Sequence, residues 1–254
     1  MRKLRQKSGL KLVTRKIQGV ITFVGWSDAS WANRKSGSST GGFLIGACGQ
    51  DVVNGSKGHV GVISWATNKL KRVARSSLAA EVQALSVTED ELHIVRAAWM
   101  EFTGTPLDVN NPDKTIRKVA GITVIDAKSI YDTMTSKNQA LHLAEKRTAI
   151  ELSAYLQNTS RNKTETRWVH GEANLADGFT KLGASQMLWD FFTTSTWSIV
   201  FDEEKVSGKK RNARGMGKLE NGVPEAKSFY QMALYKIQEQ FPDFAIDSEG
   251  SNSE

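Results

Sequence analysis

Apolar residues that alternate with small or polar ones predict strands in the first third of the chain. Three runs of this kind are separated by short polar turns, and they occupy residues 19–28, 38–49 and 59–67. A period of two residues is typical of strands that bury one face of a sheet. Because the connections between the runs are short, we expect the three strands to pair in antiparallel fashion.

A period of three to four residues then predicts one long helix over residues 76–102. Ser76 and Ser77 stand at its start, where a serine side chain can cap the helix. The apolar stripe of this helix is formed by Leu78, Val82, Leu85, Leu92, Val95 and Trp99. We expect this stripe to pack against the sheet.

Shorter patterns follow in the second half of the chain. They predict a strand at 121–126, a helix at 127–134, a helix from about 141 to 157, a strand at 164–170 and the start of a last helix at 173–182. This order indicates an α/β fold with a five-stranded mixed sheet flanked by helices. In that sheet, two parallel strands are added to the three antiparallel ones.

Composition and charge divide the chain into three parts. Residues 1–18 form a basic N-terminal segment, and residues 19–200 carry the strand and helix patterns of one domain. Residues 201–254 are first basic and then acidic, and we expect them to form a largely flexible tail. Because 34 Lys and Arg residues outnumber 27 Asp and Glu residues, a polyanionic partner such as a nucleic acid is favoured.

Two features of the sequence bear on the cellular compartment. Cys48 is the only cysteine, so no disulfide can form within the chain and a reducing compartment is expected. No apolar stretch approaches the roughly 18 residues that are needed to span a bilayer. We therefore predict a cytoplasmic or nuclear protein without a membrane partner.

Four acidic residues occupy positions that are unusual for surface carboxylates. Asp28 and Asp126 each end an apolar strand pattern, on the face of its apolar residues. Glu81 lies on the apolar stripe of the long helix, and Asp177 lies in the first turn of the last helix. Taken singly, Asp28 could start a turn and Asp126 could cap a helix. Glu81 could interact favourably with the positive, N-terminal end of its helix dipole. Asp177 could form a capping box with Asn174.

The four acids together predict a common site. The carboxyl ends of two strands can be neighbours in an α/β sheet, and two helix starts can deliver their side chains to the same edge. Four carboxylates at one edge repel one another unless divalent cations bind between them. The sequence therefore predicts a metal site built from these acids.

Four sequence blocks, taken in order, resemble a known family. They fall within residues 20–182 and are WSDASWANRKSGSSTGGFLIGACG, VISWATNKLKRVARSSLAAEVQALS, ITVIDAKSIYD and RWVHGEANLADGFTK. In this order they resemble the ribonuclease H domain that ends the Pol polyprotein of copia-type LTR retrotransposons. The resemblance implies a ribonuclease H-like fold, and it implies that residues 1–18 are a remnant of the connection to a reverse transcriptase.

The resemblance also implies an activity, the hydrolysis of the RNA strand of an RNA/DNA hybrid by two-metal-ion catalysis. The cofactor would be two Mg²⁺ ions, for which Mn²⁺ can substitute. The implied partners are the hybrid and a reverse transcriptase domain, in cis or in trans. The implied catalytic residues and metal ligands are Asp28, Glu81, Asp126 and Asp177.

Other residues are candidates for supporting roles. His170 corresponds only inexactly to a catalytic histidine of the family, and a structural role is the alternative. The basic residues that lead into the long helix could follow the phosphates of a hybrid or form a solvated turn. Ser30 and Asn33, in or near the turn after Asp28, are candidates by position alone. The substrate-binding candidates are thus Ser30, Asn33, Lys69, Lys71, Arg72 and Arg75.

Two other functions remain open at this point. A connection-type domain would keep the ribonuclease H fold and would bind nucleic acid or support a polymerase without activity. An integrase would act on DNA with a different set of acids. The segment at 135–140 is too short for the basic protrusion with which some ribonucleases H grip their substrate, so we expect weak binding by the isolated domain.

Overall fold

A mixed sheet forms the centre of the computed structural model, which describes residues 12–135, 143–181 and 185–200. The strands are β1 (Thr22–Ser30), β2 (Thr40–Cys48), β3 (Gly58–Lys69), β4 (Ala120–Ile125), β5 (Thr164–Trp168) and β6 (Thr196–Trp197). They lie in the order β5-β4-β1-β2-β3-β6. Strands β1, β2 and β3 pair in antiparallel fashion, β4 is parallel to β1, and β5 is parallel to β4.

This topology confirms the mixed sheet, but the prediction of five strands was wrong. The sixth strand, β6, pairs with the start of β3, where Trp197 lies opposite Gly58. A strand of two residues is too short to show the period of two by which strands are recognised in a sequence. The pairing adds β6 beside β3, at the opposite side of the sheet from the neighbouring strands β1 and β4.

Seven α-helices are described, and they lie between the strands or near the end of the described chain. They are α1 (Gln50–Val53), α2 (Ser77–Phe102), α3 (Pro112–Ile116), α4 (Lys128–Thr135), α5 (Lys146–Asn162), α6 (Asp177–Thr180) and α7 (Ser185–Thr194). The long helix lies where the apolar stripe predicts it, and every residue of that stripe is buried or half-buried.

Two helix predictions need correction, and two short helices were missed. The helix expected from 141 to 157 begins at Lys146 and continues to Asn162, because Lys163 adopts a left-handed conformation with φ of 52° that ends it. The last helix is two elements, α6 and α7. The short helices α1 and α3 were not predicted, since one turn is too short to display a helical period.

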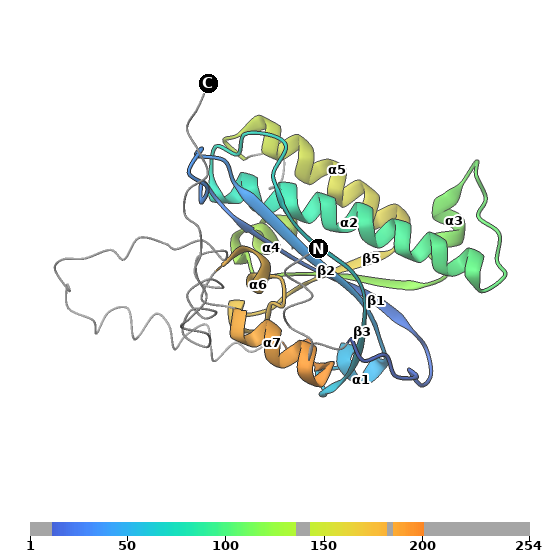
Figure 1. Ribbon diagram of the computed structural model, residues 1–254. Coiled ribbons are helices and arrows are strands. Elements are labelled where there is room, and N and C mark those ends of the chain that lie inside the picture. The colour runs from blue at the N-terminus through green and yellow to red at the C-terminus, as the bar shows by residue number, and fades with distance from the viewer. Residues whose placement is uncertain (1–11, 136–142, 182–184, 201–254) are drawn as a thin grey trace, which may run out of the picture. The chain divides into compact units, whose positions relative to one another are not determined.

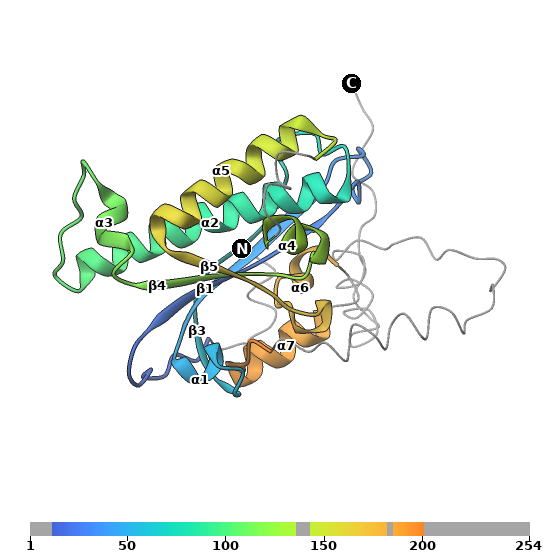
Figure 2. The same ribbon diagram turned by 180° about the vertical axis from the view of Figure 1, so that it is seen from behind.

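The two faces of the sheet are covered by different helices. Phe23 of β1 packs against Trp99 of α2, with 5.6 Å between the ring centroids. Trp26, on the opposite face of β1, belongs to a core to which α7 contributes Phe191. In both views α2 and α5 run side by side along one face of the sheet, whereas α1 and α7 lie at the other (Figure 1, Figure 2).

Several predictions fall outside the described residues. Residues 1–11, residues 136–142 and residues 201–254 are not described, so most of the basic N-terminal segment, most of the short segment at 135–140 and the whole tail are untested. The described residues belong to the unit Met1–Gly217. Among them, no helix has both the length and the apolar character to cross a membrane.

Candidate metal centre

The pairing of β1 with β4 brings two of the four acids together. These strands are parallel neighbours, and Trp26 of β1 lies opposite Val124 of β4. Asp28 and Asp126 each follow two residues later, so both side chains lie at the same end of the strand pair. Asp28 is fully buried within β1, whereas Asp126 directly follows β4. Trp168 donates a hydrogen bond of 2.9 Å from Nε1 to the carbonyl oxygen of Asp126 and so anchors the backbone there.

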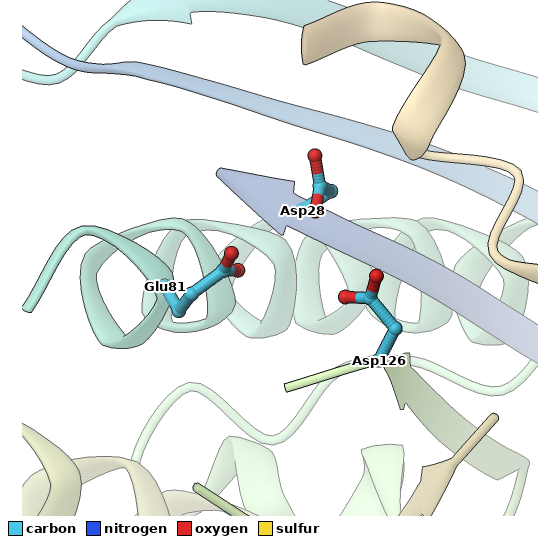
Figure 3. Close-up of side chains that lie close together, drawn as sticks. All are labelled: Asp28, Glu81 and Asp126. Carbon is cyan, nitrogen blue, oxygen red and sulfur yellow. The ribbon is translucent and has the colours of Figure 1, made fainter. Parts of the chain in front are cut away.

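The third acid comes from α2. The Ser76 side chain caps this helix by accepting a hydrogen bond of 3.1 Å from the backbone N–H of Ala79. Glu81 follows in the next turn and is half-buried. Carboxylate oxygens of Asp28, Glu81 and Asp126 lie within 4.8 Å of one another. Figure 3 shows the three side chains converging from β1, α2 and the end of β4.

The fourth acid is the first residue of α6, which packs closely on the sheet. A Cβ atom on Gly42 of β2 would lie 2.7 Å from the Cβ of Phe179, so only a glycine allows this approach without a shift. Asn174, fully buried, donates from Nδ2 to the carbonyl oxygen of Ser27 in β1 at 2.9 Å. These two contacts hold Asp177 beside β1.

Lys181, directly after α6, places its ammonium group among the acids. Its Nζ lies 3.0 Å from Asp28 Oδ1, 3.5 Å from Asp126 Oδ2 and 2.8 Å from Asp177 Oδ1. Thr180 donates a further hydrogen bond to Oδ2 of Asp28. Lys181 thus links Asp177 to the other acids. Sequence reasoning gave Lys181 no role, although its spacing of four residues from Asp177 was a visible signal.

The electrostatics of the cluster reflect its crowding. Burial raises the pKa of Asp28 to about 8, and the charges of Asp177 and Asp126 add to this shift. Burial, followed by the charge of Asp126, raises the pKa of Asp177 to about 6. Burial, followed by the charge of Asp28, also raises the pKa of Glu81 well above its usual value. For Lys181, burial lowers the pKa, but the neighbouring carboxylates outweigh it and raise the pKa overall.

The residues fit a hard divalent cation. Among the described residues, the group with metal-ligand spacing consists of carboxylates alone, which is the donor chemistry that Mg²⁺ prefers. Gly171 lies at the edge of the cluster, where a Cβ atom would be 3.1 Å from Asp126 Oδ2 and 3.7 Å from Asp177 Oδ2. Burial and, after it, the charges of the neighbouring acids raise the pKa values of Asp28 and Asp177, and a divalent cation would stabilise the ionised carboxylates.

The explanations that treat the acids singly account for little of this geometry. Asp28 does not start a turn, because it lies within β1 opposite Gly42. The residue that caps α6 is Ala176, and Asp177 pairs with Lys181, so a capping box with Asn174 does not describe this acid. Asp126 lies two residues before α4, and Glu81 lies beyond the first turn of α2.

His170 has a structural partner in this arrangement. Its Nδ1 accepts a hydrogen bond of 3.3 Å from the backbone N–H of Glu172 and so caps the 3₁₀ turn Gly171–Ala173. This contact supports the structural alternative. His170 also directly precedes Gly171, which lies at the edge of the acid cluster. A part in catalysis therefore stays a prediction.

The substrate-binding candidates lie on the surface near the ends of β1 and β3 and before α2. Ser30 ends β1 and is half-buried, while Asn33 follows in the loop and accepts a hydrogen bond from Thr40 at 2.9 Å. Arg72 pairs with Glu151 of α5, so its guanidinium is partly engaged. The remaining candidates are exposed, and they are Lys69, Lys71 and Arg75.

Comparisons of the sequence with known proteins give no relative. No family model matches the chain, and no curated protein matches it.

Comparison of the structure with solved structures finds ribonuclease H domains. One is the N-terminal RNase H domain of a Mycobacterium tuberculosis protein fused to maltose-binding protein, with 13% identity, a TM-score of 0.38, and coverage of 67% of this chain and 98% of that chain. RNase H1 from the archaeon Halobacterium salinarum has 12% identity and a TM-score of 0.37, over 65% of this chain and 98% of that chain. Prototype foamy virus protease-reverse transcriptase has 11% identity over 68% of this chain and 22% of that chain, with a TM-score of 0.39. TM-scores below 0.5 show neither a shared family nor a shared activity.

Proposed function

We propose that this protein is a Mg²⁺-dependent endoribonuclease with a ribonuclease H-like fold that hydrolyses the RNA strand of RNA/DNA hybrids. The observation that carries the proposal is the convergence of Asp28, Glu81 and Asp126 within 4.8 Å, from three elements that are distant in the sequence. Asp177 joins them through Lys181. The order of the four sequence blocks supports an origin in the Pol polyprotein of a copia-type retrotransposon.

The four acids would hold two Mg²⁺ ions, and Mn²⁺ would substitute. When bound, these ions supply an activated water and stabilise the charge on the departing 3′ oxygen. Asp28 would contribute from the buried strand β1, where it pairs with Gly42 of β2. Glu81 and Asp126 contribute from the side of α2 and β4, and Asp177 from α6. The protein's part is to hold the carboxylates rigid and close together, which pre-organises the site.

The surface beside the acids would bind the hybrid. Lys69, Lys71 and Arg75 are exposed on the segment that leads into α2, where they would contact phosphates. Ser30 and Asn33 would contact the backbone or the sugar, and the 2′-hydroxyl would distinguish RNA from DNA. A reverse transcriptase domain, in cis or in trans, would supply additional affinity in the cytoplasm or nucleus.

The test is cleavage of a labelled RNA/DNA hybrid by the purified protein in Mg²⁺ and in EDTA. We expect Mg²⁺-dependent cutting of the RNA strand, and a loss of at least about 100-fold for Glu81→Gln, because even outer-shell partners of metal ligands cost 10- to 100-fold. Glu101→Gln is the matched control, since it makes the same change at an exposed position of the same helix.

Other outcomes separate the alternative functions. Hybrid binding without cleavage, both alone and with a fused polymerase, would indicate a connection-type domain. Cutting of double-stranded DNA in place of the hybrid would indicate an integrase. Cleavage that survives Glu81→Gln would contradict the assignment of the site.

A further inference from the structure

Lys181 is placed to act on the same carboxylates that a metal ion would use. Its ammonium group has three N–H donors, and three acids lie around it. Two of these contacts are hydrogen bonds, to Asp28 Oδ1 at 3.0 Å and to Asp177 Oδ1 at 2.8 Å. The lysine therefore offsets part of the negative charge of the cluster.

Within the part of the chain that the structure describes, the acids have few other partners that could balance their charge. Asp28 is fully buried, and its second oxygen accepts from the neutral hydroxyl of Thr180. Glu81, the acid outside the three ion pairs, is also influenced by the charge of Lys181. Clustered carboxylates destabilise a fold unless a cation lies among them, so Lys181 stabilises the folded chain when no metal is bound.

The side chain of Lys181 is also able to leave the cluster. It is 42% exposed, whereas those of Asp28 and Asp177 are 0% and 10% exposed. It extends from a residue with extended backbone at the end of α6, so rotation of its flexible stem moves the ammonium without unpacking the core. A divalent cation and the ammonium group compete for the same oxygens, and the cation carries the higher charge.

We propose that Lys181 is a built-in counter-ion of the metal centre, which stabilises the cluster when it is empty of metal and is displaced when Mg²⁺ binds. This inference rests on the proposed function, because it takes the four acids to be Mg²⁺ ligands. By linkage, a group that stabilises only the metal-free state weakens metal binding by the same free energy. Lys181 thus sets the Mg²⁺ concentration at which the site fills.

The experiment measures metal binding and stability without substrate. In Lys181→Met, the Mg²⁺ affinity obtained by calorimetry is expected to rise on the order of tenfold, within the usual range of coupling between two ligands. The melting temperature in EDTA is expected to fall, and the increase caused by Mg²⁺ is expected to grow. Lys181→Arg keeps the positive charge, so its melting temperature in EDTA should equal that of the wild type. Lys114→Met is the matched control, because it removes one exposed lysine at α3.

The results separate this inference from the proposed function. An unchanged or weaker Mg²⁺ affinity in Lys181→Met would overturn the counter-ion role, even if the wild-type protein cleaves hybrids. Tighter Mg²⁺ binding in a protein that cleaves no hybrid would overturn the proposed function and leave the counter-ion role intact. If Lys181→Met does not fold in EDTA, adding Asp28→Asn should restore folding, because one of the repelling charges is then absent. Failure of that rescue would also overturn the counter-ion role.

Discussion

Helix α2 contributes to two clusters of buried polar groups that differ in their charge balance. The acid cluster contains Asp28, Glu81, Asp126 and Asp177, with Lys181 as its cation. The second, which we call the polar cluster, lies further along the helix and contains Glu89, Arg96, Asn162 and Thr164. Among the described residues, the first contains four acids and one lysine, which pairs with three of them, whereas the second contains one arginine and one glutamate.

The polar cluster connects elements that are distant in the sequence. The guanidinium group of Arg96, fully buried, donates to the carbonyl oxygens of Val119 and Asn162 and to the Thr164 hydroxyl, at distances of 2.6 to 3.0 Å. Thr164 in turn donates to Oε1 of Glu89 at 2.9 Å. These hydrogen bonds tie α2 to the start of β4, the end of α5 and the start of β5.

From this difference we infer different roles for the two clusters. The polar cluster satisfies a buried cation with many acceptors, as buried charges require in order to stabilise a fold. The acid cluster keeps like charges close together, which lowers the stability of the fold and is typical of a cation-binding site. The two clusters therefore predict opposite effects when a charge is removed.

Removal of the arginine should have the largest effect. Arg96→Met leaves buried carbonyl oxygens without donors and Glu89 without its cation, so we expect the free energy of unfolding to fall by about 3–5 kcal/mol. Urea denaturation followed by circular dichroism measures this loss. Arg147→Met, at an exposed position of α5, is the matched control and should change stability by less than about 0.5 kcal/mol. A loss below about 1 kcal/mol for Arg96→Met would remove the contrast between the clusters.

A smaller effect is expected where α6 meets the sheet. In Gly42→Ala, the new methyl group would lie 2.7 Å from the Cβ of Phe179, so α6 must move away from β2. Overpacking of this kind costs about 1–3 kcal/mol, and the displacement of Asp177 should weaken Mg²⁺ binding as well. The matched control is Gly61→Ala in β3, where the nearest atom would be 3.9 Å away. Equal stability and equal Mg²⁺ affinity in the two variants would show that α6 tolerates the methyl group.

Most of the acid cluster could be predicted from the sequence, because local periodicity determined its placement. Alternation placed Asp28 and Asp126 at the ends of strands, and the apolar stripe of α2 placed Glu81 against the sheet. The sequence predicted two parallel strands beside the three antiparallel ones, but the pairing of β4 with β1 is a finding of the structure. Asp177 was predicted as a helix start, but nothing local indicated that Gly42 would admit α6 to the sheet.

The polar cluster was not predicted, because its contacts depend on the tertiary structure. Arg96 lies among polar and apolar residues of a helix, and its burial depends on carbonyl oxygens more than twenty residues away. The position of Lys181 likewise depends on the tertiary structure, because two of its three acidic partners, Asp28 and Asp126, come from distant segments. The two-residue strand β6 was missed for a related reason, since tertiary pairing with β3 defines it and no local pattern does.

The pH dependence of stability should distinguish the acid cluster from ordinary surface acids. The folded-state pKa of Asp28 is about 8, above its usual value of 3.8, so the folded protein binds the proton more tightly than the unfolded chain. This stabilisation is complete below about pH 4 and is lost as the pH rises towards 8. We therefore expect the melting temperature in EDTA to fall between pH 5 and pH 8. Added Mg²⁺ should reverse the trend, because it binds the deprotonated acids.

Asp28→Asn tests this explanation directly. The variant has no proton to lose at this position, so its melting temperature in EDTA should change less between pH 5 and pH 8. At pH 8 we expect it to be more stable than the wild type by at least about 1 kcal/mol, roughly the free energy that one unit of pKa shift represents. It should also lose the stabilisation by Mg²⁺. The same pH dependence in wild type and variant would place the titrating group elsewhere.

Substitutions of surface lysines should have the smallest effects on stability. They compare the surfaces beside the two clusters by their affinity for nucleic acid. Lys69 and Lys71 are exposed on the segment that leads to the acid cluster, whereas Lys114 and Lys118 are exposed at and after α3, near the polar cluster. Replacing the first pair by alanine should weaken hybrid binding and reduce the slope of log K against log salt by about 1 for each phosphate that the protein no longer neutralises. Fluorescence anisotropy in EDTA measures binding without cleavage. Replacing the second pair removes the same charge and should leave the slope unchanged, so equal slopes for both pairs would mean that the hybrid does not bind beside the acids.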